Sequence, residues 1–235
     1  MATINFYGLV YAIGSLLLIV IIHYFLRQQK QNTNLKYKLA IYLLLGTIIG
    51  TRLFYIIFYN PMYFINNPLR IFNIWQGGLS FHGGLLGVLL SSYLFSKKYN
   101  VNFLKLADIL TLPFTFLLIF GKIANFINIE SYGKITELPF CVTFKGIQGC
   151  RHPVQLYEAV KNIILLSVLA NLKKRNLRDG LITMLFIFLY SITRFLIDIF
   201  REYHHTLFGI GIGQYLNFIT IIISGFYLIK FLKNP

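Results

Sequence analysis

The chain has 235 residues, of which 57% are hydrophobic, 17% aromatic and only 12% charged. This composition excludes an ordinary water-soluble domain of the same length. The formal net charge of +15 would point to nucleic acid as a partner in a cytosolic protein, but here most basic residues lie in short tracts between apolar segments, where they contact lipid headgroups.

Apolar windows long enough to span a bilayer recur along the whole chain, since a membrane-spanning helix needs roughly 20 mostly apolar residues. The N-terminus has no basic stretch followed by a small-residue cleavage site, so its first apolar segment is interpreted as a retained helix rather than a removable signal peptide. We predict one all-α membrane domain over residues 1–235, with seven transmembrane helices at about 7–26, 37–59, 79–96, 105–127, 154–170, 181–200 and 209–232.

The basic residues give this bundle an expected orientation. Of the 22 Lys and Arg residues, 13 fall in loops on one side: Arg27, Lys30, Lys36, Lys38, Lys97, Lys98, Lys105, Lys173, Lys174, Arg175, Arg178, Lys230 and Lys233. The positive-inside rule makes that side cytoplasmic, with the N-terminus outside and the C-terminus inside. The outer loops 60–78, 128–153 and 201–208 are then expected to hold the polar chemistry.

The second predicted span contains Gly46 and Gly50 at GxxxG spacing, followed by Arg52. We expect the glycines to permit close helix packing. Arg52 has three possible arrangements: a pair with Asp198, a pair with Glu130, or extension toward the membrane surface.

A glycine-rich block over 75–87 opens the third predicted span and contains Ser80 and His82. Glycines let the backbone approach a ligand closely and leave N–H groups free to bind an anion. A histidine among them can exchange a proton near neutral pH. The alternative is a glycine-rich turn that only packs.

The end of the fourth predicted span carries a cluster of polar side chains: Lys122, Asn125, Asn128 and Glu130, with Gly133 after them. Buried amides and charges need partners, which a lipid headgroup or mutual pairing would supply.

The loop that follows contains both cysteines, Cys141 and Cys150. A disulfide there needs an oxidising compartment, and we expect free thiols because unpaired loop cysteines are also common.

The fifth predicted span opens with Gln155, Tyr157 and Glu158 after Pro153, and a glutamate near a helix N-terminus also has a helix-dipole explanation.

The sixth predicted span carries ionisable residues that the membrane interior disfavours by a few kcal/mol each. Tyr190, Arg194, Asp198 and Arg201 are spaced i, i+4, i+8 and i+11, which places them within about 80° on one helix face. Two arginines against one acid favour an anionic ligand such as a phosphate. A buried Arg194–Asp198 pair that only orients helices is the alternative.

Taken together, these blocks resemble the prolipoprotein diacylglyceryl transferase family. The resemblance covers most of the chain in order: Phe6–Tyr11, Gly50–Leu53, Trp75–Gly87, Gly121–Gly133, His152–Glu158 and Tyr190–Arg201. The blocks over 75–87 and 121–133 are the most specific.

This resemblance implies a seven-helix enzyme of the bacterial cytoplasmic (inner) membrane with its active site toward the outer leaflet. The implied reaction transfers sn-1,2-diacylglyceryl from phosphatidylglycerol to the thiol of the lipobox cysteine in a prolipoprotein signal peptide, giving a thioether and glycerol-1-phosphate. The implied partners are phosphatidylglycerol, the prolipoprotein and membrane lipids. No metal or organic cofactor and no nucleic acid are implied.

The resemblance also implies roles for particular residues. Tyr7, His82 and Arg194 would be catalytic: Arg194 would hold or polarise the departing phosphate, and His82 would assist thiol deprotonation or orient the headgroup. Tyr7 and Asn125 would line the lipid site. The full substrate-binding set is Arg52, Ser80, Lys122, Asn125, Asn128, Glu130, Gly133, Gln155, Tyr157, Glu158, Tyr190, Asp198 and Arg201.

The chain also departs from the family pattern. Lys122 replaces an arginine, which keeps the charge but loses the bidentate fork. Glycines are replaced by Ala124 and Ile129, a glutamate by Asp198, and a His-Trp pair by Asn5 and Phe6.

Three alternatives stay open at this point. The first is a diverged relative that binds an anionic lipid with weak or different transferase activity. The second is a membrane transferase for another headgroup, and the third is a small-solute transporter, which would also explain buried charges. Against transport, the polar residues cluster at the outer ends of the spans and leave the inner halves apolar.

Overall fold

The computed structural model describes residues 16, 19–27, 32, 34–175, 177–203, 206–207 and 210–233. The chain divides into two compact units, one within 110–235 and the other within 18–109. Nearly all regular structure in the described residues is helical, in agreement with the predicted class. The first predicted span, 7–26, lies largely outside the described residues.

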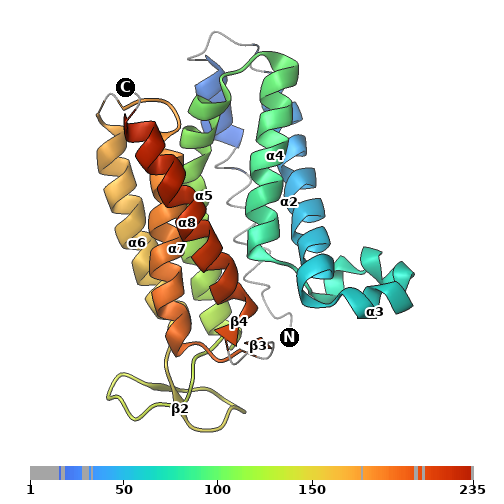
Figure 1. Ribbon diagram of the computed structural model, residues 1–235, viewed down its shortest axis with the longest axis vertical. Coiled ribbons are helices and arrows are strands. Elements are labelled where there is room, and N and C mark those ends of the chain that lie inside the picture. The colour runs from blue at the N-terminus through green and yellow to red at the C-terminus, as the bar shows by residue number, and fades with distance from the viewer. Residues whose placement is uncertain are drawn as a thin grey trace. The chain divides into compact units, whose positions relative to one another are not determined.

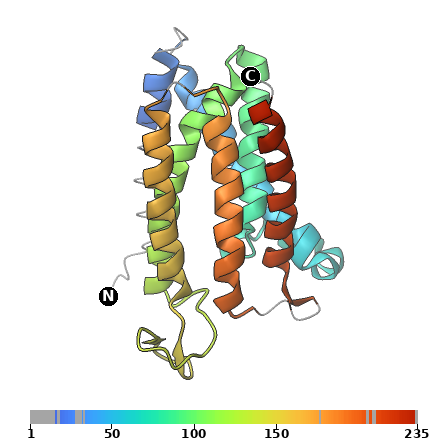
Figure 2. The ribbon, with the colours of Figure 1, turned by 60° about the vertical axis from the view of Figure 1, so that its left-hand side comes forward.

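The unit within 110–235 is a bundle of long helices that alternate in direction (Figures 1 and 2). Helix α5 (Phe103–Ile127) enters it, and α6 (Val154–Lys173), α7 (Leu181–Ile197) and α8 (Ile212–Lys233) follow in chain order. A short 3-10 helix, η3 (Asp198–Phe200), extends α7. The alternation follows from the short connections, which return the chain to a neighbouring helix.

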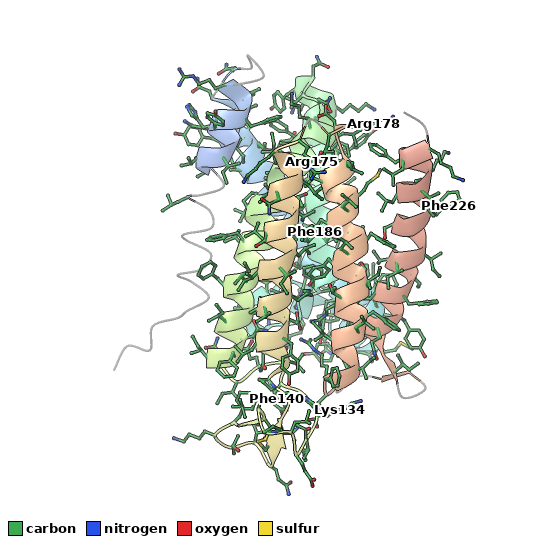
Figure 3. The ribbon with its side chains drawn as sticks, turned by 90° about the vertical axis from the view of Figure 1, so that its left-hand side faces the viewer. Lys134, Phe140, Arg175, Arg178, Phe186 and Phe226 are labelled. Carbon is green, nitrogen blue, oxygen red and sulfur yellow. A yellow bond between two sulfur atoms is a disulfide. The ribbon has the colours of Figure 1, made fainter. Side chains whose placement is uncertain are left out.

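Packing in this bundle is aromatic and aliphatic at mid-height and polar near one end. The rings of Phe114 and Phe186 meet edge to face at 5.9 Å, and the hydroxyls of Thr111 and Thr183 lie 3.0 Å apart. Phe186 lies at mid-height in Figure 3. Burying such rings supplies much of the stabilisation of a helical core.

The unit within 18–109 is organised by the pair α2 (Leu35–Tyr59) and α4 (Phe81–Tyr99). A Cβ added at Gly46 would lie 2.6 Å from Ser91 Cβ, and one added at Gly50 would lie 2.9 Å from Gly87 Cα. The two helices therefore approach at backbone distance, as small residues at GxxxG spacing permit. The predicted packing role of Gly46 and Gly50 is confirmed.

Between α2 and α4 the chain forms an arm of short helices rather than a polar loop. Its elements are α3 (Pro61–Asn66), η1 (Pro68–Phe72) and η2 (Ile74–Gln76). Pro61 and Pro68 begin the first two, as proline at a first helical position does. The large apolar side chains of the arm are exposed: Met62, Ile65, Leu69, Phe72 and Trp75. The segment 60–78, which was predicted as an outer loop, therefore consists of short helices with exposed apolar side chains that the sequence analysis did not predict.

The loop between α5 and α6 contains an antiparallel pair of two-residue strands, β1 (Val142–Thr143) and β2 (Cys150–Arg151). A second pair, β3 (Thr206–Leu207) and β4 (Ile210–Gly211), precedes α8. Cys141 and Cys150 form a disulfide with a Cα–Cα distance of 5.4 Å. The expectation of free thiols was wrong, because the β1–β2 register pairs Val142 with Arg151 and Thr143 with Cys150, which brings Cys141, the residue before β1, within bridging distance of Cys150.

Four helices among the described residues are long and apolar enough to cross a membrane, over Leu35–Tyr59, Phe103–Ile127, Leu181–Phe200 and Ile212–Lys233. Helix α6 differs because its first half is polar, with Gln155, Glu158, Lys161 and Asn162. The chain is thus a helical membrane protein, and its total of seven spans stays a prediction.

Candidate functional site

The fully buried carboxylate of Glu158 is the centre of an ion cluster within 110–235. Lys122 Nζ of α5 lies 2.6 Å from Glu158 Oε2. Arg194 of α7 and Arg201, directly after η3, both form ion pairs with the other oxygen, Oε1. One carboxylate on the second turn of α6 therefore joins three basic side chains from separate parts of the chain.

Asp198 is the second acid of the cluster, and it is only 1% exposed. Its Oδ1 lies 3.2 Å from Arg194 Nη2 and 3.6 Å from Arg201 Nε. Asn217 of α8 donates a hydrogen bond of 3.1 Å from Nδ2 to Asp198 Oδ2. The helical spacing that suggested a polar stripe therefore does bring these residues together, and the alternative of a buried Arg194–Asp198 pair describes one part of a larger cluster.

The charges of this cluster do not cancel. Lys122, Arg194 and Arg201 carry three positive charges against two negative charges on Glu158 and Asp198. Among the described residues, the cluster therefore contains one more basic side chain than carboxylates, and buried charge is costly unless it is paired. Tyr203 lies next to the cluster, and burial, followed by the charge of Asp198, raises the pKa of its hydroxyl. That hydroxyl therefore stays protonated and can donate a hydrogen bond.

The start of α6 is fixed by contacts with the loop before it. Gln155 is fully buried and donates from Nε2 to the backbone carbonyl of Glu130 at 2.7 Å. Gly133 lies so close to His152 that an added Cβ would meet its Cβ at 2.6 Å. Tyr157 places its hydroxyl 3.2 Å from His152 Nδ1. These contacts set the position of Glu158 one turn further along.

The remaining predicted residues of the 121–133 block lie at the end of α5. Asn125 is half-buried, whereas Asn128 and Glu130 are exposed. The Glu130 backbone participates in the site through Gln155, but its carboxylate is not among the ion pairs of the cluster.

Arg52 is buried in the other unit and binds backbone carbonyls. Its guanidinium donates to Arg70 O at 2.6 Å and Gly77 O at 2.8 Å, with further bonds to the carbonyls of Ile71, Asn73 and Gly78. It also stacks 4.9 Å from the Phe64 ring. Of the arrangements considered for Arg52, none described this carbonyl cage, which holds the arm against α2.

Ser80 and His82 lie at the start of α4 in the same unit as Arg52. Ser80 is the N-cap, and its Oγ accepts from the Gly83 backbone N–H at 3.5 Å. The half-buried His82 ring stacks on Phe54 at 6.2 Å. Tyr7 lies outside the described residues.

Three buried residues near the cluster escaped the sequence analysis: Lys161, Asn162 and Asn217. Lys161 and Asn162 follow Glu158 by three and four positions and so lie on the same helix face. An ionisable residue inside the fifth predicted span is the same signal that pointed to Arg194 and Asp198 in the sixth, and it would have identified Lys161. Asn217 gave no such signal, because it is an isolated amide in an apolar segment.

Comparison with known proteins agrees with this architecture. A family model described as prolipoprotein diacylglyceryl transferase matches residues 1–230. The chain belongs to this family. Among its relatives, a phosphatidylglycerol–prolipoprotein diacylglyceryl transferase of Rickettsia typhi is 37% identical and covers 97% of this chain and 92% of its own length. A protein of the same name from Rickettsia akari is 38% identical, over 96% and 91%. One from Geobacter sulfurreducens is 43% identical, and the match covers 68% of this chain and 62% of that relative.

Proposed function

We propose that this chain transfers sn-1,2-diacylglyceryl from phosphatidylglycerol to the lipobox cysteine of a prolipoprotein. Membership of the family supports the reaction class. The observation that carries the proposal for this chain is the buried cluster around Glu158, whose net positive charge fits a phosphodiester. Both of its arginines present planar guanidinium groups, which bind phosphate oxygens in pairs.

The transfer is a substitution at carbon. The cysteine thiol loses its proton, and the thiolate sulfur attacks the sn-3 carbon of the diacylglyceryl group, because the thiolate is the competent nucleophile. The bond between that carbon and its phosphate oxygen breaks, and its electron pair leaves with the phosphate. The products are a thioether and glycerol-1-phosphate, and the thiol proton passes to a base.

The arginines act on the leaving group. As the carbon–oxygen bond breaks, negative charge grows on the phosphate, and Arg194 and Arg201 stabilise it more in the transition state than in the bound lipid. Glu158 and Asp198 hold both guanidinium groups in place through Oε1 and Oδ1, so little reorganisation is needed. Lys122 adds a positive charge from α5.

The other site residues are assigned by family position and chemistry. His82 assists thiol deprotonation or orients the headgroup, and Tyr7 and Asn125 line the lipid site. Arg52 and Ser80 fix the backbone of the 70–83 segment that leads to His82. Gln155, Tyr157 and Gly133 position the start of α6.

The protein is further proposed to span the bacterial cytoplasmic membrane seven times as one domain, with the site toward the outer leaflet. The distribution of charge supports this orientation. In Figure 3, Arg175 and Arg178 lie at one end of the bundle, and Lys134 and Phe140 lie at the other, with the disulfide loop. Basic residues mark the cytoplasmic end, and a disulfide fits the opposite, oxidising side.

The test is transfer of labelled diacylglyceryl from phosphatidylglycerol to a lipobox peptide by the purified full-length protein, with a cysteine-to-serine peptide as the negative control. Arg194→Ala should lower transfer by a factor of about 10²–10³ or more, the loss typical of removing one preorganised donor. Arg175→Ala removes the same side chain from the opposite end of the bundle (Figure 3) and should keep wild-type transfer.

Cysteine-dependent labelling that Arg194→Ala abolishes would support both the reaction and the phosphate site. Full activity of Arg194→Ala would overturn the phosphate assignment. No labelling by well-folded protein that still binds phosphatidylglycerol would favour a diverged relative, for which Lys122 in place of an arginine is the specific observation.

A further inference from the structure

A second polar layer lies one helical turn further into the bundle than the Glu158 cluster. Lys161 and Asn162 follow Glu158 by three and four residues on α6, so they occupy the same helix face. Tyr190 precedes Arg194 by four residues on α7. Lys161 is 7% exposed, Tyr190 3% and Asn162 0%, and Lys161 Nζ lies 3.6 Å from the centroid of the Tyr190 ring.

Two side chains of this layer, Lys161 and Asn162, have unsatisfied polar atoms. Within the described part of the chain, neither Lys161 Nζ nor the side-chain nitrogen and oxygen of Asn162 has a hydrogen-bond partner. The face of the Tyr190 ring attracts the ammonium group of Lys161, but this contact is not a hydrogen bond. Buried donors without an acceptor are costly and rare in native structures, so a bound molecule that accepts hydrogen bonds would be stabilised here.

The position of the layer indicates which atoms of that molecule are involved. Three to four residues along α6 correspond to about 4.5–6 Å beyond Glu158, away from the disulfide loop. If the Glu158 cluster binds the phosphate of a phospholipid, as the proposed function states, the groups a few bonds deeper are the ester carbonyls of the two acyl chains. Ester carbonyl oxygens are neutral and only accept hydrogen bonds.

We propose that Lys161 Nζ and Asn162 Nδ2 donate hydrogen bonds to the ester carbonyl oxygens of the diacylglyceryl group. The charged guanidinium groups of Arg194 and Arg201 suit the phosphate, whereas a primary amine donates whether or not it is protonated and therefore suits a neutral acceptor in an apolar layer. The layer thus makes the enzyme selective for diacyl lipids. This inference rests on the proposed function.

Selectivity against ether lipids gives a direct test. A dialkyl ether analogue of phosphatidylglycerol keeps the headgroup, the phosphate and the chains but lacks both carbonyls. The purified full-length protein should transfer the diacyl group with a kcat/KM about 10–100 times that of the dialkyl group, since a site built to hydrogen-bond its substrate rejects analogues that leave its polar groups unpaired.

Variants assign this selectivity to the layer. Lys161→Met should lose transfer mainly with the diacyl lipid, so that the ratio of the two kcat/KM values falls toward one, and Asn162→Leu should change the ratio in the same direction. The matched control is Lys230→Met, which removes an exposed lysine near the end of α8 and should leave the ratio at its wild-type value.

Thermal unfolding separates binding from a purely structural role. Because Lys161 is buried without an acceptor, Lys161→Met should raise the Tm of lipid-free protein, and the diacyl lipid should then protect the variant less than it protects wild type. A lower Tm of the variant, with equal loss of transfer on both lipids, would assign Lys161 to helix packing and overturn the inference.

Equal kcat/KM values of wild type for the two lipids would also overturn it. Absence of transfer with every lipid would count against the proposed function instead, and the difference in thermal protection between diacyl and dialkyl lipid would still decide whether the layer binds carbonyls.

Discussion

Removing the negative charge of Glu158 should destabilise the bundle strongly. Glu158→Gln keeps the size and shape of the side chain but leaves Lys122, Arg194 and Arg201 with only Asp198 as an acid. Because Glu158 is fully buried, the free energy of unfolding should fall by about 3–5 kcal/mol, as it does when one partner of a buried ion pair is removed.

This loss translates into a measurable change in thermal unfolding. At about 2–4 °C per kcal/mol for a chain of this size, the Tm of Glu158→Gln should fall by about 6–20 °C. The matched control is Glu202→Gln, which makes the same substitution in the ion pair with Arg151, where the Glu202 side chain is 39% exposed. Arg151 is buried, but water reaches the Glu202 carboxylate and screens the pair, which should contribute about 0–1 kcal/mol, as surface pairs do. The Tm of the control should therefore fall by no more than about 4 °C.

The assay is scanning fluorimetry of both variants and wild type in one detergent, repeated with added phosphate. Phosphate should restore more stability to Glu158→Gln than to wild type, since an anion replaces the missing charge. Equal Tm values for Glu158→Gln and Glu202→Gln would show that the cluster is solvated and would refute the argument for a buried anion site.

Three further predictions concern other parts of the chain. Lys122→Arg should keep or raise transfer because a bidentate phosphate contact becomes possible, whereas full transfer by Lys122→Ala would remove position 122 from the site. Gly83→Ala should lower the Tm, because its Cβ would collide with the Gly50 carbonyl and Phe54, and overpacking of this kind lowers the free energy of unfolding by about 1–3 kcal/mol. Gly121→Ala is the control and should not lower the Tm, because no neighbouring atom lies within 4 Å of the added Cβ. Cys141→Ser should lower the free energy of unfolding by about 2–3 kcal/mol, the value that the chain-entropy model gives for a disulfide between residues nine positions apart. A reductant should lower the Tm of wild type to that of the variant. A wild-type Tm that does not change with reductant would contradict this prediction.

The sequence could predict the local part of the ion cluster. Arg194, Asp198 and Arg201 come together because their spacing on one helix face is a property of the helix itself. The arrival of Lys122 and Glu158 from two other helices depends on packing across the bundle, which residue spacing does not determine. The resemblance to the family named both residues but did not give their pairing.

The misses have similar physical causes. The short helices of 60–78 were not predicted, because only its asparagines and glycines were weighed and not Pro61 and Pro68, which are strong signals for helix starts. The disulfide depended on the register of two-residue strands, which are too short to leave a pattern. Lys161 was overlooked because the polar residues at the start of α6 were examined only up to Glu158.

The loop closed by Cys141 and Cys150 leads directly into Arg151 and His152, whose backbones pair with the segment around Gly133 and Lys134. Thiols stay reduced where proteins are synthesised and oxidise only after leaving that compartment. On the proposed outer side of the membrane, this disulfide would therefore form only after the loop has been translocated, so the segment leading to Glu158 would be completed after the helices are inserted.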